Sequence, residues 1–148
     1  FERVDFVDLE ETPDYDFSNY GIIYVSGGNT FRLLKFAKLA NFKKTINALF
    51  NRGGVYIGVS AGSYIMCPRI EMSLWKHPNR DDFGLTDLSA FNFIPFLLTV
   101  HYTREYKDII KEHAEKAKYP TRILTDEQAF FIKDDIAQFI GEGEEIKL

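Results

Sequence analysis

The sequence is poor in cysteine, in long apolar runs and in positive charge. Cys67 is the one cysteine among 148 residues, so an internal disulfide is excluded and a reducing compartment, the cytoplasm, is expected. No apolar run approaches the roughly 18 residues of a membrane span, so we expect no membrane association. Acidic residues (22) outnumber basic residues (18), and the net charge of -4 argues against a nucleic-acid partner.

Metal-ligand and nucleotide-binding patterns are missing as well. Cys67, His77, His101 and His113 have no paired spacing of the kind that holds zinc, so no metal is expected. The glycine turn at residues 26–30, S-G-G-N-T, matches neither the dinucleotide fingerprint nor the P-loop. We therefore predict a protein that works without a cofactor.

Apolar segments of strand length alternate with helical patterns along the chain. Strands are predicted at residues 3–9, 21–25, 55–59, 97–100 and 121–124, and helices at residues 31–39, 42–51 and 106–118. This order favours an α/β fold with a mostly parallel sheet flanked by helices on both faces. The continuous apolar run at residues 21–25 is typical of a strand covered on both faces. Residues 129–132 and 136–140 predict a C-terminal β-hairpin.

A G-x-S-x-G pattern lies where the predicted strand at residues 55–59 meets the next helix. Gly58 and Gly62 flank Ser60 in this pattern. A sharp strand-to-helix turn of this kind exposes the serine hydroxyl, and small flanking residues avoid clashes within it. Ser60 is therefore a candidate nucleophile. The alternative is that the two glycines only form a tight turn.

A serine nucleophile needs a base, and three histidines are available. His101 follows the predicted strand at residues 97–100 and would share the carboxyl edge of the sheet with Ser60. His77 lies in a polar segment, residues 69–83, which we predict to be a loop that overhangs the site. His113 lies among charged residues on a predicted helix. His77 and His113 are expected at the surface, and His101 is the candidate base.

The residues alone leave the acid of a triad open. Asp126 and Glu127 both follow the predicted strand at residues 121–124 and would also emerge at a carboxyl end. Asp82 and Asp87 precede His101, which would give the chain order serine, aspartate, histidine of ordinary α/β-hydrolases. Asp126 and Glu127 could also be turn residues that only introduce the hairpin.

An oxyanion site requires two backbone donors close to the nucleophile. The N–H of Ala61 follows Ser60 directly, and a second N–H could come from the Gly27-Gly28 turn after the preceding strand. Both groups would lie at the same sheet edge.

Four ordered segments resemble one family. They are Gly27-Gly28-Asn29-Thr30 with the following F-R-L-L, Gly58-Val59-Ser60-Ala61-Gly62 with Cys67-Pro68 after it, the stretch 91–102 that leads to His101, and residues 124–129, L-T-D-E-Q-A. Together they are similar to the S51 serine peptidases, the family of aspartyl dipeptidase (peptidase E) and cyanophycinase. The similarity runs from about Val4 to the end of the chain.

The resemblance implies a fold related to class I glutamine amidotransferases and a role for each matching residue. Ser60 would be the nucleophile, His101 the base and, by position, Glu127 the acid. Gly28 and Ala61 would be the oxyanion donors, and Asn29 would bind substrate. Arg104 is a further candidate for substrate binding from its chemistry alone, because a guanidinium suits a substrate carboxylate. The alternative is that Arg104 is an ordinary surface arginine.

The resulting expectation is a serine peptidase that hydrolyses short peptides through an acyl-enzyme, with dipeptides carrying an N-terminal Asp as the candidate substrates and a homodimer as the candidate assembly. We expect residues 1–148 to form a single α/β domain without the strand and helix with which the family's catalytic unit usually begins. Thr99-Val100 stands where peptidase E has Asn-Pro, and the following loop is shorter, which leaves specificity open. The alternatives are a catalytically inactive S51-like binding or scaffold protein, or an esterase or amidase of other specificity.

Overall fold

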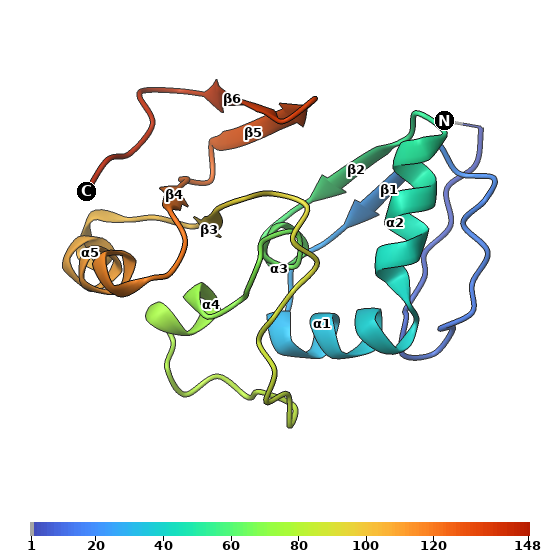
Figure 1. Ribbon diagram of the computed structural model, residues 1–148, viewed down its shortest axis with the longest axis horizontal. Coiled ribbons are helices and arrows are strands. Elements are labelled where there is room, and N and C mark those ends of the chain that lie inside the picture. The colour runs from blue at the N-terminus through green and yellow to red at the C-terminus, as the bar shows by residue number, and fades with distance from the viewer. Residues whose placement is uncertain (1) are drawn as a thin grey trace.

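A computed structural model describes residues 2–148 of the chain (Figure 1). The strands are Ile22–Val25 (β1), Val55–Gly58 (β2), Leu97–Thr99 (β3), Thr121–Ile123 (β4), Gln128–Lys133 (β5) and Ile136–Gly141 (β6). The helices are Thr30–Leu39 (α1), Phe42–Asn51 (α2), Ala61–Tyr64 (α3), Met72–Trp75 (α4), Lys107–Lys116 (α5) and a 3₁₀ turn, Arg104–Tyr106 (η1). Strands and helices therefore alternate as predicted.

The parallel pair β1 and β2 carries the first half of the fold. Their register runs from Ile22 opposite Val55 to Val25 opposite Gly58. Two helices make the crossover between these strands, as parallel pairing requires. The buried faces of α1 and α2 include Leu34 and Ile46, both fully buried. The register of the pair ends β1 and β2 at the same edge.

The second parallel pair, β3 and β4, carries the other half. Leu97 pairs with Thr121, and Thr99 pairs with Ile123. Helix α5 makes the connection and buries Ile110. Backbone hydrogen bonds continue beyond the strands, from Leu124 N–H to Thr99 O at 3.0 Å and from Tyr102 N–H to Leu124 O at 3.0 Å. They hold the carboxyl ends of both strands together.

The predicted continuous sheet does not form. Residues 2–148 contain three two-stranded sheets, β1-β2, β3-β4 and the antiparallel hairpin β5-β6, and Figure 1 shows them at separate places along the molecule. The expectation of parallel strands with helical crossovers is confirmed, whereas the expectation of one sheet covered on both faces is wrong. Each parallel pair makes its ladder bonds internally, and β2 and β3 belong to different sheets.

Two strand predictions near the N-terminus also need correction. Residues 3–9 form no strand, because no neighbouring segment offers a ladder to their alternating pattern. Strand β1 is covered on one face only: Ile23 is buried, while Tyr24 is 61% exposed. The continuous apolar run at β1 therefore did not mean burial on both sides.

The segment predicted as an overhanging loop, residues 69–83, contains the short helix α4. The following loop is attached to the first helix by three side chains. Asn29 Nδ2 donates to Asp81 O at 2.9 Å, Lys35 Nζ to Phe83 O at 3.0 Å, and Lys38 Nζ to the Asp87 carboxylate at 3.0 Å. The loop is thus held beside the glycine turn that begins α1. Within residues 2–148, no helix has the length and apolar character needed to cross a membrane.

Candidate active site

Ser60 occupies a sharp turn between β2 and α3. Its backbone has φ of 53° and ψ of -112°, a conformation that L residues rarely adopt. The flanking glycines make the turn possible. A Cβ at Gly58 would lie 2.6 Å from Gly62 O, and a Cβ at Gly62 would lie 2.2 Å from Val25 O. Both flanking positions of the G-x-S-x-G pattern therefore require glycine, because any side chain there would clash with the backbone.

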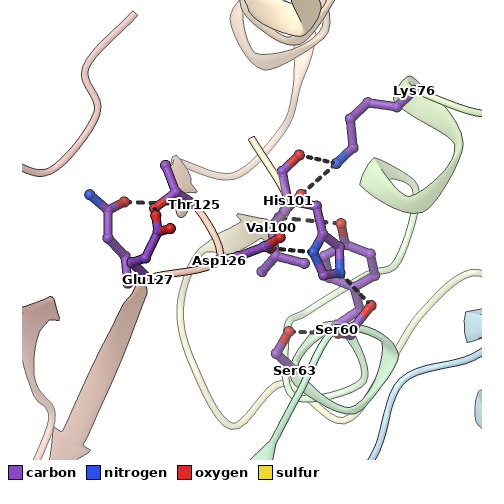
Figure 2. Close-up of polar contacts among 10 residues, drawn as sticks. Ser60, Ser63, Lys76, Val100, His101, Thr125, Asp126 and Glu127 are labelled. Carbon is purple, nitrogen blue, oxygen red and sulfur yellow. Dashed lines mark hydrogen bonds and ion pairs between the residues drawn. The ribbon is translucent and has the colours of Figure 1, made fainter. Parts of the chain in front are cut away.

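His101 meets Ser60 from the end of the other parallel pair. It lies just beyond β3, separated from it by one residue, and has a φ of 56°. Its Nε2 lies 2.9 Å from Ser60 Oγ, within hydrogen-bonding distance (Figure 2). The two candidate residues, 41 positions apart in sequence, are thus brought together. This contact joins the carboxyl ends of two separate sheets.

Asp126 lies on the opposite nitrogen of the imidazole. Its Oδ1 is 2.5 Å from His101 Nδ1. A carboxylate only accepts hydrogen bonds, so Nδ1 carries the proton and Nε2 is left to accept the Ser60 hydroxyl proton. Serine, histidine and aspartate therefore form a continuous hydrogen-bonded chain in the order that nucleophilic catalysis requires.

Glu127, which we predicted as the acid, is not in contact with His101. Its carboxylate accepts a hydrogen bond from Thr125 Oγ1 at 3.3 Å, and Figure 2 shows it beside Thr125 and away from the imidazole. The alternative acids are also engaged elsewhere. Asp82 accepts from Gly84 N–H at 2.8 Å, and Asp87 pairs with Lys38. The geometry therefore brings Asp126, and not Glu127, into contact with His101.

The hydrogen-bonded chain is open to solvent. The His101 side chain is 51% exposed and the Asp126 side chain is 72% exposed, so water screens the attraction between them. Ser60 is half-buried. The groups of the chain are thus accessible from solvent.

Of the predicted oxyanion donors, Ala61 directly follows Ser60, and Gly28 belongs to the glycine turn beside it. A Cβ built on Gly27 would be 3.2 Å from Ser60 Cβ, so the glycine turn touches the nucleophile. Gly28 has a φ of 137°, a backbone conformation that favours glycine. Across residues 2–148, the amides of Gly28 and Ala61 donate to no other protein group. Neither N–H group is therefore engaged by the described part of the protein.

Asn29 and Arg104 were predicted to bind substrate. Asn29 Oδ1 accepts hydrogen bonds from the amides of Phe31 and Arg32 and so caps α1, while its Nδ2 holds Asp81 O. Its amide group is thus occupied by the fold. Arg104 begins η1, is exposed, and forms no ion pair with the residues that the structure describes.

A cavity of about 340 Å³ opens beside the glycine turn. Its wall includes Asp8 and Tyr20 from the N-terminal segment, Arg32 from α1, and Gly27 and Gly28. Ser60 does not line it. The glycine turn therefore lines the cavity and also lies beside Ser60.

The remaining candidate ligands and nucleophiles lie outside this chain of contacts. His113 stacks on Trp75 with ring centroids 5.5 Å apart, and exposed His77 meets the edge of Tyr106 at 6.3 Å. Cys67 is fully buried, and burial raises the pKa of its thiol to about 12. Within residues 2–148, no group of three His, Cys, Asp or Glu residues could hold a metal ion.

Sequence reasoning left one residue at the site undecided and missed another. Asp126 and Glu127 were both candidates, because two adjacent acids after one strand give no sign of which one faces inward. Lys76 was not identified from the sequence. It directly follows α4 and reaches the backbone of His101, to which its Nζ donates at 3.1 Å. No sequence pattern marks a lysine in an irregular segment for such a contact.

The chain is similar to known peptidases. A model of peptidase family S51 matches residues 3–140. An uncharacterized peptidase, Lmo0363, from Listeria monocytogenes is 34% identical over 117 residues, which cover 75% of this chain and 56% of that protein. Peptidase E of Escherichia coli is 34% identical over 88 residues, which cover 57% of this chain and 35% of that protein.

A solved structure agrees with these relatives. A putative peptidase E protein from Listeria monocytogenes EGD-e superimposes with a TM-score of 0.71 and 28% sequence identity. The match covers 84% of this chain and 61% of that one. The chain therefore spans between about a third and three fifths of the length of these proteins.

Proposed function

The chain belongs to peptidase family S51, and we propose that it is a serine peptidase that cleaves short peptides through an acyl-enzyme. The observation that carries this proposal is the continuous contact from Ser60 Oγ through the His101 imidazole to Asp126. Such a chain turns a weakly nucleophilic hydroxyl into a reactive one. The family and the relatives named peptidase E support the same class of reaction.

The proposed reaction has two halves. Ser60 Oγ attacks the carbonyl carbon of the peptide bond while its proton passes to His101 Nε2, and the amides of Gly28 and Ala61 stabilise the oxyanion. The same proton then goes to the leaving amine as the C–N bond breaks, which leaves an ester on Ser60. Water, deprotonated by His101 Nε2, attacks this ester and releases the acid and free Ser60.

Asp126 supports both halves without giving up or taking a proton. Its Oδ1 accepts the Nδ1 proton of His101 and so fixes the tautomer in which Nε2 is free. It also attracts the imidazolium that forms in each half. Because both groups are well exposed, this attraction is weaker than in a buried triad.

We propose dipeptides with an N-terminal Asp as the substrates. The similarity to peptidase E motivates this choice, and exposed Arg104, three residues beyond His101, offers a guanidinium to a substrate carboxylate. The cavity beside Gly28 offers space for the part of the substrate beyond the reacting carbonyl.

The decisive variant is Ser60→Ala. We expect it to lose turnover of Asp-p-nitroanilide by roughly 10⁴-fold or more, as removal of a serine nucleophile does elsewhere. Ser18→Ala, at an exposed serine of the N-terminal segment, is the matched control and should keep full activity. A fluorophosphonate probe should label the wild-type chain and fail to label Ser60→Ala. Equal turnover in the Ser60→Ala variant would show that another residue carries the reaction, and an unlabelled wild-type chain would favour a binding protein.

A further inference from the structure

The side chain of Lys76 ends at the backbone of the candidate base. Its Nζ donates to Val100 O at 2.5 Å and to His101 O at 3.1 Å (Figure 2). We propose that Lys76 is a positioning residue that fixes the backbone of Val100 and His101 so that the imidazole reaches Ser60. This inference rests on the proposed function, because it assigns Lys76 a part in the same reaction.

The backbone at His101 needs such support. Its φ of 56° places an L residue in the left-handed region, which costs free energy relative to an ordinary strand or helix conformation. This turn brings the consecutive carbonyl oxygens of Val100 and His101 to one ammonium group. An ammonium has three donors and no acceptor, so it can satisfy both carbonyls at once. Charge assistance makes each bond stronger than one to a neutral donor.

The amide side of the same segment is held by other groups. Val100 N–H donates to Tyr64 Oη at 3.3 Å, and Tyr102 N–H donates to Leu124 O at 3.0 Å. Lys76 is therefore the side chain that holds the carbonyl side. Removal of the Lys76 ammonium would leave the strand pairing intact. It would free only the carbonyl groups of Val100 and His101.

The Lys76 ammonium lies in a partly buried environment that contains charged and aromatic groups. The residue is half-buried, and burial lowers the pKa of its amine, while the charge of Asp126 acts in the opposite direction. The positive charge of Arg80 also lowers this pKa. The ammonium further lies 5.4 Å from the centroid of the Tyr106 ring. The Lys76 ammonium is thus in contact with two carbonyl oxygens and near an aromatic ring.

Three variants test the proposal. Lys76→Met keeps the length of the side chain and removes its donors, Lys76→Arg keeps a cation with several donors, and Lys111→Met removes an exposed lysine of α5 as the control. We expect Lys76→Met to lower kcat for Asp-p-nitroanilide by roughly 10- to 100-fold with KM changed less than about 3-fold, because small misplacement of a catalytic group has effects of this size. Lys76→Arg should recover most of the loss, and Lys111→Met should match the wild type.

A structure of the Lys76→Met variant gives a readout that does not depend on activity. We expect the distance from His101 Nε2 to Ser60 Oγ to exceed hydrogen-bonding reach, with the fold and the thermal midpoint close to those of the wild type. An unchanged contact overturns the proposal, and so does a Lys76→Met variant that fails to fold or one that retains wild-type kcat. Equal losses in Lys76→Met and Lys76→Arg overturn it as well. Failure of the proposed function would look different, because the wild-type chain itself would then neither turn over substrate nor react with the fluorophosphonate.

Discussion

The carboxylate that assists His101 can be identified with two neighbouring variants, Asp126→Asn and Glu127→Gln. Each replaces a carboxylate by an amide of nearly the same shape, so the two differ only in which side chain is neutralised. Asp126 contacts His101 Nδ1 at 2.5 Å, whereas Glu127 contacts Thr125. We expect activity to depend on Asp126 and to be nearly indifferent to Glu127.

The size of the effect follows from the exposure of the pair. Two unit charges about 4 Å apart attract by about 1 kcal/mol in water and about 4 kcal/mol near a protein surface. With side chains that are 51% and 72% exposed, His101 and Asp126 fall between these limits. A loss of about 2–3 kcal/mol in the transition state corresponds to roughly a 100-fold decrease in kcat/KM. This is smaller than the roughly 10⁴-fold effect known for the aspartate of a buried triad.

The assay is turnover of Asp-p-nitroanilide together with the rate of fluorophosphonate labelling at Ser60. Asp126→Asn should slow both by about the same factor, since both need a deprotonated Ser60 hydroxyl, and roughly 100-fold is the expected value. Glu127→Gln should change either rate by less than about 2-fold. A larger loss in Glu127→Gln than in Asp126→Asn would refute the assignment and return the role to Glu127.

Two further predictions concern the framework of the site. Gly62→Ala should destabilise the fold by roughly 1–3 kcal/mol or more, because the added Cβ would lie 2.2 Å from Val25 O. Gly21→Ala is the control and should be neutral, because a Cβ there meets open space. Thermal unfolding of both variants measures the difference. The Cys67 thiol is fully buried, and its pKa is raised to about 12. It should therefore stay unreactive toward Ellman's reagent in the folded chain at about pH 8 and react once the chain is unfolded. Rapid reaction of the folded chain would contradict this burial.

Local structure could be predicted from the sequence with good accuracy. The helices α1 and α2 begin and end within one residue of their predicted limits, and the hairpin β5-β6 lies where its two apolar segments predicted it. These elements depend on their own residues: Asn29 caps α1 through its side chain, and Gly53-Gly54 follows the end of α2. The glycine spacing around Ser60 likewise follows from contacts with its immediate surroundings.

Long-range pairing could not be predicted in the same way. The alternation of strands and helices indicated parallel pairs, but it carried no information on whether β2 and β3 would pair, because ladder bonds join residues far apart in sequence. The exposed side of β1 illustrates the consequence. Tyr24 lies in an apolar run, and its exposure depends on which elements cover that face rather than on the run itself.

The choice between Asp126 and Glu127 could not be made from the sequence for a related reason. Both follow β4, and the strand's two-residue alternation no longer applies in the turn beyond Ile123. The deciding contact is long-range: Tyr102 N–H bonds to Leu124 O, which places the residues just after β4 beside His101. Asp126 then lies within reach of Nδ1, and Glu127 has already turned toward β5.

The site is set by backbone conformation more than by side-chain choice, and this explains where its sensitive positions lie. Ser60 and His101 contact each other, and both have positive φ values, 53° and 56°. Conformations of this kind persist only where the surroundings hold them. The glycines at 58 and 62 allow the first, and hydrogen bonds from Lys76 support the second. Substitutions at these supporting positions should therefore separate Ser60 from His101 even though both reacting side chains remain in place.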